Sequence, residues 1–166
     1  PQRLRENLSR LPNEETNMAA EYRITLSPKT LETAQGKARD VLEKAKKQVG
    51  FIPNMYAAMV NSPGVLETYL AGYDVFRKES GFSPIEQEVV FLTISKENDC
   101  RYCLAAHSTL ADRMSGVPTE VTDAIREGRT VPDERLEALS RFTRTMVETR
   151  GLPRQEDVSS FLDAGY

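Results

Sequence analysis

The sequence of 166 residues is poor in cysteine and histidine, with two of the former and one of the latter. All three lie in one short segment, as Cys100, Cys103 and His107. A structural zinc site takes four ligands, so this set would need Glu88 or water as the fourth. Thiol and imidazole chemistry, if the protein has any, is therefore confined to this segment.

The sequence also lacks a large excess of charge of one sign and any long apolar run. A net charge of −3 leaves no polybasic face, so we expect no nucleic-acid partner. No apolar run approaches the roughly 20 residues of a membrane helix, and the N-terminus has no apolar h-region of a secretion signal. We therefore expect a soluble cytoplasmic protein without a membrane partner. In a reducing compartment, Cys-x-x-Cys indicates redox chemistry or metal binding more often than a structural disulfide.

Internal repeats and low-complexity segments are absent too, and the chain length favours one domain. Residues 1–26 mix Arg, Glu, Asn and Pro with little apolar periodicity. We interpret them as an N-terminal arm, mobile or lying on a neighbouring subunit, and residues 27–166 as the folded domain. This domain is predicted to be all-α, because Ser or Pro stands at the start of most periodic segments and Gly at several ends. The expected helices cover residues 27–50, 53–60, 62–79, 83–96, 99–116, 118–127 and 132–150, with a last segment from residue 153.

The helix that precedes the cysteines has a clear start signal. Ser83 is a predicted N-cap, and Glu86 completes a capping box three residues later. Because Glu86 is used by the cap and Glu88 lies on nearly the opposite face, only Glu88 is expected to point toward the thiols. Asp99 is predicted to cap the next helix.

That next helix carries Cys100, Cys103 and His107 on one stripe, at positions i, i+3 and i+7. Cys100 lies at the helix start, where the helix dipole favours a thiolate. His107 follows Cys103 by four residues and is within reach as a base. Other interpretations stay open. The cysteines could be small buried apolar residues, His107 could be a core histidine bonded to a carbonyl, or the three could bind a metal. Tyr69 and Tyr73, one turn apart, are expected to pack in the core, with pocket lining the second interpretation.

The complete spacing resembles that of a known family. Glu88, eleven residues, Cys100-x-x-Cys103, three residues and His107 is similar to the motif of the AhpD-like, carboxymuconolactone decarboxylase superfamily, in particular its peroxidase-related branch. The segment 50–81 resembles the Pro-Asn turn and helix that precede this motif. The best-known alkyl hydroperoxidases of the family carry a second histidine between the cysteines, where this chain has Arg-Tyr.

The resemblance implies an AhpD-like helical bundle and a cofactor-free thiol peroxidase. Cys103 would attack a hydroperoxide, Cys100 would close a disulfide, and an external dithiol would reduce it. His107 would move the proton and Glu88 would orient it. Helix-dipole reasoning alone favours Cys100 as the more stable thiolate. The alternatives are a decarboxylase-type lyase, which needs no dithiol, and a non-enzymatic redox sensor.

The same resemblance predicts a homo-oligomer, most simply a trimer or a hexamer, with the segment 83–116 near a subunit contact. We also expect that the chain lacks the last packing helix of its relatives, and that apolar residues near its end are buried against another subunit.

Overall fold

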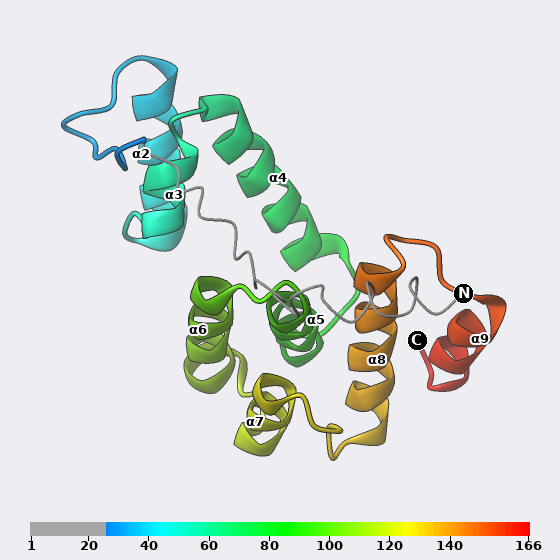
Figure 1. Cartoon of the computed structure of the whole chain (residues 1–166). Helices are drawn as coiled ribbons and strands as arrows, with labels where there is room; N and C mark the ends of the chain where they lie inside the picture. Colours follow the sequence, from blue (N-terminus) through cyan, green and yellow to red (C-terminus); the bar gives the residue numbers. More distant parts are fainter. Residues whose placement is uncertain (1–25) are drawn as a thin grey trace, which may run out of the picture. The chain divides into compact units, whose positions relative to one another are not determined.

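A computed structural model describes residues 26–166, and none of these residues forms a strand (Figure 1). The prediction of an all-α fold is therefore confirmed for this part of the chain. The predicted N-terminal arm lies, except for residue 26, outside the described residues. None of the described helices is long and apolar enough to span a membrane. The elements are α2 (Lys37–Val49), α3 (Asn54–Met59), α4 (Pro63–Glu79), α5 (Pro84–Glu97), α6 (Arg101–Leu110), the π-helical η2 (Ala111–Ser115), α7 (Thr119–Glu127), α8 (Glu134–Glu148) and α9 (Gln155–Asp163).

Tertiary contacts divide the chain into two compact units, one that ends at Thr68 and one that begins at Tyr69. The division falls inside α4. The described part of the first unit contains α2, α3 and the start of α4, with Leu42, Ala45, Val60 and the other buried side chains of these helices as its core. The second unit contains every residue that the sequence singles out for chemistry. The predicted boundary between an arm and a domain at residue 26 stays a prediction.

The first predicted helix begins later than expected. The prediction of a helix from residue 27 is wrong, because α2 starts at Lys37. Gly36 has φ 52°, in the left-handed region, and a helix cannot continue through this conformation. Before it, the Thr30 backbone N–H donates to the Thr33 hydroxyl over 2.8 Å, a local bond that competes with helix formation. The predicted end at Gly50 is confirmed, with φ 88°.

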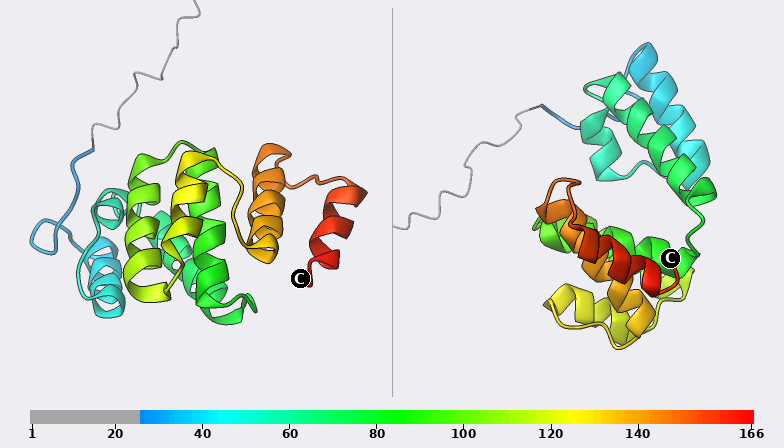
Figure 2. Two further views of the ribbon diagram at one scale, coloured as in Figure 1. Left: turned by 90° about the horizontal axis from the view of Figure 1, so that it is seen from below. Right: turned by 90° about the vertical axis from the view of Figure 1, so that its right-hand side faces the viewer.

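Helix α5 is the centre of the second unit. It packs against α6, α7 and α8, which Figures 1 and 2 show around it. Val89 and Leu92 of α5 are fully buried in this core, and burial of such a side chain contributes about 1.5–3 kcal/mol. The hydroxyls of Thr93 and Ser140 lie 3.0 Å apart and join α5 to α8 inside it. Side chains on the buried face of α5 are therefore held in fixed places.

The start of α5 has the predicted capping box. The Ser83 hydroxyl accepts from the Glu86 backbone N–H over 3.3 Å, and the Glu86 carboxylate accepts from the Ser83 N–H over 2.7 Å. Arg135 of α8 forms an ion pair with Glu86 over 3.1 Å. Burial raises the pKa of Glu86, but the bonds from Ser83 and the charge of Arg135 outweigh it, and the pKa lies below its usual value. Glu86 thus stabilises the helix start and leaves Glu88 as the interior carboxylate.

The turn between α5 and α6 differs from the prediction in one residue. Asp99 does not cap α6; it has φ 50°, and Cys100 is the N-cap. The Cys100 N–H donates to the Ser95 carbonyl over 2.9 Å, which joins the turn to the end of α5. Because the chain reverses through Asp99, the first residue with a side chain placed to cap is Cys100. Helix α6 then passes into η2, which ends at Gly116 as predicted.

Candidate functional site

The two cysteines form a disulfide at the start of α6. Their Cα atoms are 5.3 Å apart, and the Cys100 sulfur accepts from the Cys103 backbone N–H over 3.3 Å. Both residues are half-buried. Arg101 and Tyr102 between them are exposed, with 45% of Tyr102 accessible. A sulfur pair at such a helix end lies near solvent, where a small oxidant or a reducing thiol can approach it.

His107 lies farther along the same helix and contacts the preceding one. Its Nδ1 atom is 2.8 Å from Oε2 of Glu88 on α5. The Glu88 side chain is 1% exposed and that of His107 is 12% exposed. A carboxylate can only accept a hydrogen bond, so Nδ1 carries the hydrogen and Nε2 is left for proton exchange. The structure therefore places an oriented imidazole one helical turn after Cys103.

The structure thus brings the four predicted residues together as two contacting pairs, the Cys100–Cys103 disulfide at the start of α6 and Glu88 with His107. Residues four apart on a helix are neighbours on its surface, so Cys103 and His107 share a face of α6. Glu88 reaches this face from α5, which packs directly on α6.

A fifth polar residue belongs to this group, and sequence reasoning missed it. Arg77 of α4 donates from Nη2 to Glu88 Oε1 over 2.5 Å and to the Tyr73 hydroxyl over 2.7 Å. Its Nη1 donates to Gln87 Oε1 over 3.0 Å. Burial lowers the pKa of Arg77, but the hydrogen bonds to Tyr73 and Glu88 outweigh it and the pKa lies above its usual value. A permanent cation is therefore in contact with the buried carboxylate.

A signal for Arg77 does exist in the sequence. Arg77 follows Tyr73 by one helical turn, and Tyr73 belongs to the apolar stripe that predicts the buried face of α4. An arginine beside that stripe can reach inward, and a buried carboxylate such as Glu88 requires a charged partner. Neither point identifies the pair alone, because the two residues lie on different helices.

Aromatic rings surround the charged atoms. The Phe91 ring stacks on the His107 ring with centroids 4.4 Å apart and an angle of 9° between planes. The Arg77 guanidinium lies 4.7 Å from the Phe91 centroid and 4.9 Å from that of Tyr73. Tyr69 stacks on Tyr73 at 5.9 Å, and both rings are half-buried beside the apolar core. Because the Tyr73 hydroxyl accepts from Arg77, Tyr73 also belongs to the lining of this group, so core packing does not account for it alone. The rings reduce solvent access to Glu88 and strengthen its electrostatic interactions.

The metal interpretation has no geometric support in residues 26–166. No group of three or more His, Cys, Asp or Glu side chains there is arranged to hold a metal ion. The cysteine sulfurs are bonded to each other, and the Glu88 oxygens are bonded to Arg77 and His107.

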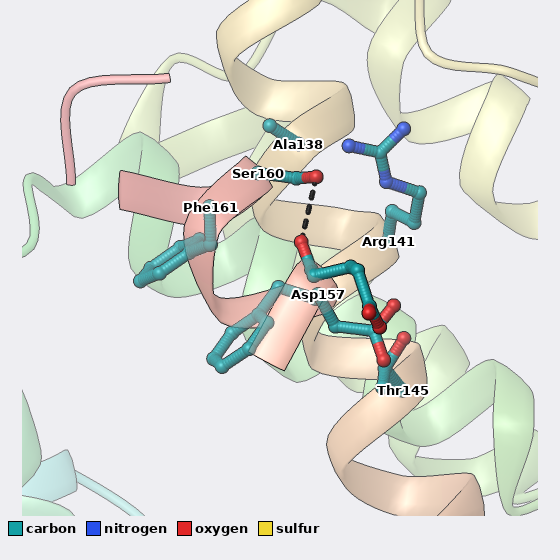
Figure 3. Close-up of a pocket in the computed structure, with 8 residues that line it drawn as sticks. Ala138, Arg141, Thr145, Asp157, Ser160 and Phe161 are labelled. Carbon is teal, nitrogen blue, oxygen red and sulfur yellow. Dashed lines mark hydrogen bonds between the residues drawn. The ribbon is translucent and has the colours of Figure 1, made fainter. Parts of the chain in front are cut away.

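A separate cavity of about 230 Å³ lies between α8 and α9, and Figure 3 shows its lining. Arg141 and Asp157 are among its lining residues, and the Ser160 hydroxyl there donates to the carbonyl of Glu156 over 2.8 Å. None of the predicted site residues lines it. The cysteine–imidazole group is therefore the site with recognisable chemistry.

Comparisons with known proteins bear on the family and the fold of this chain. Residues 63–144 match the sequence model of the "Carboxymuconolactone decarboxylase family", a range that includes both cysteines, His107, Glu88 and Arg77. A crystal structure titled "alkylhydroperoxidase AhpD core: uncharacterized peroxidase-related protein", from Ralstonia eutropha JMP134, is 20% identical in sequence. It superposes with a TM-score of 0.71 over 85% of this chain and 75% of that chain. At this identity the likeness establishes the fold. A search of curated proteins found no match.

Proposed function

We propose that this chain, which belongs to the AhpD-like, carboxymuconolactone decarboxylase superfamily, is a thiol-dependent hydroperoxide reductase of the peroxidase-related branch. The observation that carries the proposal is the Cys100–Cys103 disulfide at the start of the helix that also holds His107, which is bonded to buried Glu88. A lyase acting on a lactone needs acid–base groups but no dithiol. The cysteine pair therefore favours redox chemistry.

The first step is oxidation of Cys103. Its thiolate sulfur attacks the terminal oxygen of a hydroperoxide, the O–O bond breaks, and an S–OH group forms. The sulfur loses two electrons and the peroxide gains them. The alkoxide that leaves takes a proton, supplied by the His107 imidazolium, and departs as an alcohol.

The second step closes the disulfide. The Cys100 thiolate attacks the Cys103 sulfur, the S–O bond breaks, and hydroxide leaves as water with the proton that the Cys100 thiol released. The Cys103 N–H that points to the Cys100 sulfur, together with the helix dipole, favours the thiolate form of Cys100. Cys100 is thereby suited to this attack, and an S–S bond replaces the S–O bond.

The third step restores the dithiol. An external dithiol reduces the disulfide by two successive exchanges and leaves as its own disulfide. These exchanges return two electrons and two protons to the cysteines. His107 accepts the proton of the Cys103 thiol at the start of the next cycle. Glu88 orients the imidazole through Nδ1 and stabilises its protonated form. No cofactor takes part in this sequence of steps.

The proposal includes a cytoplasmic homo-oligomer, a trimer or a hexamer. Several large apolar side chains of the described residues face solvent, among them Met114 and Leu152, which are 78% and 79% exposed. Burial of such surface contributes about 25 cal/mol per Å² and favours association.

The test is consumption of a hydroperoxide with dithiothreitol or dihydrolipoamide as the reductant. The parent protein should consume many equivalents of hydroperoxide per subunit, and Cys103→Ser should consume none above the background rate. Cys100→Ser should form a sulfenic acid on Cys103 but no internal disulfide, so its turnover requires direct attack of the external dithiol on that sulfenic acid and should be slower than that of the parent. A parent protein that reacts only once under excess reductant would be a redox sensor, and the enzymatic proposal would fail.

A further inference from the structure

The carboxylate of Glu88 has a different basic side chain at each of its oxygens. Oε1 accepts from the Arg77 guanidinium over 2.5 Å, and Oε2 lies 2.8 Å from His107 Nδ1. An arginine is charged at every relevant pH, whereas a histidine carries charge only when protonated. One carboxylate is thus shared between a permanent cation and a conditional one.

Arg77 is held in this place by contacts other than Glu88. Gln87 donates from Nε2 to the Arg77 carbonyl over 3.0 Å and to the Phe82 carbonyl over 2.9 Å. This use of its amide N–H groups leaves Gln87 Oε1 to accept from Arg77 Nη1. The Tyr73 hydroxyl accepts from Nη2, and the Arg77 side chain is only 21% exposed. The guanidinium cannot leave Glu88 without breaking several hydrogen bonds at once.

The charge of Arg77 changes what Glu88 does to the imidazole. If His107 were its sole partner, the negative charge of buried Glu88 would be balanced only by an imidazolium, and the imidazole would hold its proton tightly. With Arg77 present, the guanidinium already balances the negative charge of Glu88 when the imidazole is neutral. A charge in contact with a titrating group moves its titration by about 1–3 pH units. The effect of Arg77 on His107, transmitted across Glu88, should lie toward the lower end of that range.

We propose that Arg77 is a positioning residue that keeps Glu88 ionised and oriented while its charge leaves the His107 imidazole free to accept the thiol proton. The proposal deepens the proposed function and rests on it, since it assigns a role in the same proton transfer. Arg77 acts through Glu88 and is given no contact with substrate.

The groups that bear on His107 come from three helices. Glu88 contacts it from α5, and Arg77 and Tyr73 lie beyond Glu88 on α4. The two cysteines precede it on α6 and do not titrate while they are joined. The oxidised protein is therefore the simplest form in which to measure the effect.

The test uses the fact that the chain has a single histidine, so one set of imidazole NMR signals reports on His107. In the oxidised full chain, Arg77→Met should raise the pH midpoint of these signals by about one unit or more. Arg77→Lys keeps the charge and should leave the midpoint within a few tenths of a unit of the parent. Lys78→Met is the matched control, because Lys78 is the next residue, is exposed and pairs with Asp74; it should have no effect.

Two results would overturn the proposal: an unchanged midpoint in Arg77→Met, or an equal shift in Lys78→Met. Should Arg77→Met fail to fold, Arg77→Gln keeps a hydrogen-bonding side chain without the charge and carries the same expectation. A merely structural role for Arg77 would alter stability without this upward shift.

A second readout connects the shift to the thiol. In reduced protein with Cys100→Ser, added Arg77→Met should move the pH profile of Cys103 alkylation, and added Arg77→Lys should largely restore it. The NMR titration requires no turnover, so it separates the two proposals. If the parent shows no peroxidase activity but Arg77→Met still raises the midpoint of His107, the enzymatic proposal fails and the role of Arg77 stands. If the parent is active but Arg77→Met leaves the midpoint unchanged, the role of Arg77 fails and the enzymatic proposal stands.

Discussion

His107 and Glu88 are nineteen positions apart in the chain, and their side chains meet at 2.8 Å between Nδ1 and Oε2. The contact forms because α5 packs along α6, with Glu88 on the inward face of α5. It converts a histidine that follows a cysteine pair into an imidazole of defined orientation. The predictions about proton transfer rest on this contact between Glu88 and His107.

The disulfide should be reversible and confined to one chain. After mild oxidation, mass spectrometry with alkylation should find neither Cys100 nor Cys103 labelled, and no covalent dimer. After dithiothreitol, both thiols should be labelled. Two labelled thiols in protein treated with peroxide would contradict the dithiol mechanism.

Replacement of the imidazole should slow the thiol without unfolding the chain. His107→Gln should lower the rate of Cys103 alkylation near neutral pH by about 10²–10⁴-fold, the usual contribution of a general base. The Cys100→Ser background makes Cys103 the only thiol in the assay. Circular dichroism of His107→Gln checks that the fold is intact. An unchanged rate of Cys103 alkylation would mean that His107 has a purely structural role.

Removal of the carboxylate at the α5 cap should produce a stability loss that depends on pH. The pKa of Glu86 is lowered in the folded protein, so its stabilising contribution is present above its ordinary value of 4.5 and is lost as the pH falls through the lower folded value. Glu86→Gln keeps an acceptor for the Ser83 N–H but loses the charge, so it should be less stable than the parent at pH 7 by about 0.3–1 kcal/mol, the usual contribution of an anion at a helix N-terminus. The difference should narrow on acidification below about pH 4.

Urea unfolding of the parent and Glu86→Gln at several pH values measures this difference. The control is Glu79→Gln, because Glu79 is an exposed carboxylate at the end of α4. A gap between parent and Glu86→Gln that stays constant between pH 7 and pH 3 would rule out ionisation as its cause.

The protein should associate in solution. Light scattering after gel filtration at micromolar concentration should give the mass of three or six chains of 18.7 kDa. Exposed apolar side chains such as Met114 and Leu152 supply surface that association can bury. A single species with the mass of one chain would defeat the prediction.

Local signals in the sequence were enough for most helix boundaries and for the family. The box of Ser83 and Glu86, and the glycine at residue 116, act through hydrogen bonds and backbone preferences within a few residues. The spacing of the cysteines and His107 places them along one helix whatever surrounds it. The resemblance based on that spacing was confirmed by the family match over residues 63–144.

Two local predictions were wrong because the sequence shows residue types but not backbone conformation. The apolar stripe of α2 extends back to Leu31 and Ala34, yet the backbone at Gly36 adopts φ 52° and starts the helix there. Asp99 is a common capping residue, but here the chain reverses through it and Cys100 caps instead. In both places several backbone states are locally accessible, and tertiary packing selects one.

The amino-acid sequence by itself determined which residues can do chemistry here: two thiols, one imidazole and a carboxylate on the preceding helix. Only the tertiary structure decided that Glu88 is buried, that it contacts His107, and that Arg77 is its second partner. Hydrogen bonds within a helix depend on neighbours three or four residues away, so they can be predicted from spacing. Contacts between helices depend on which faces pack together, and this is set by the burial of the whole core.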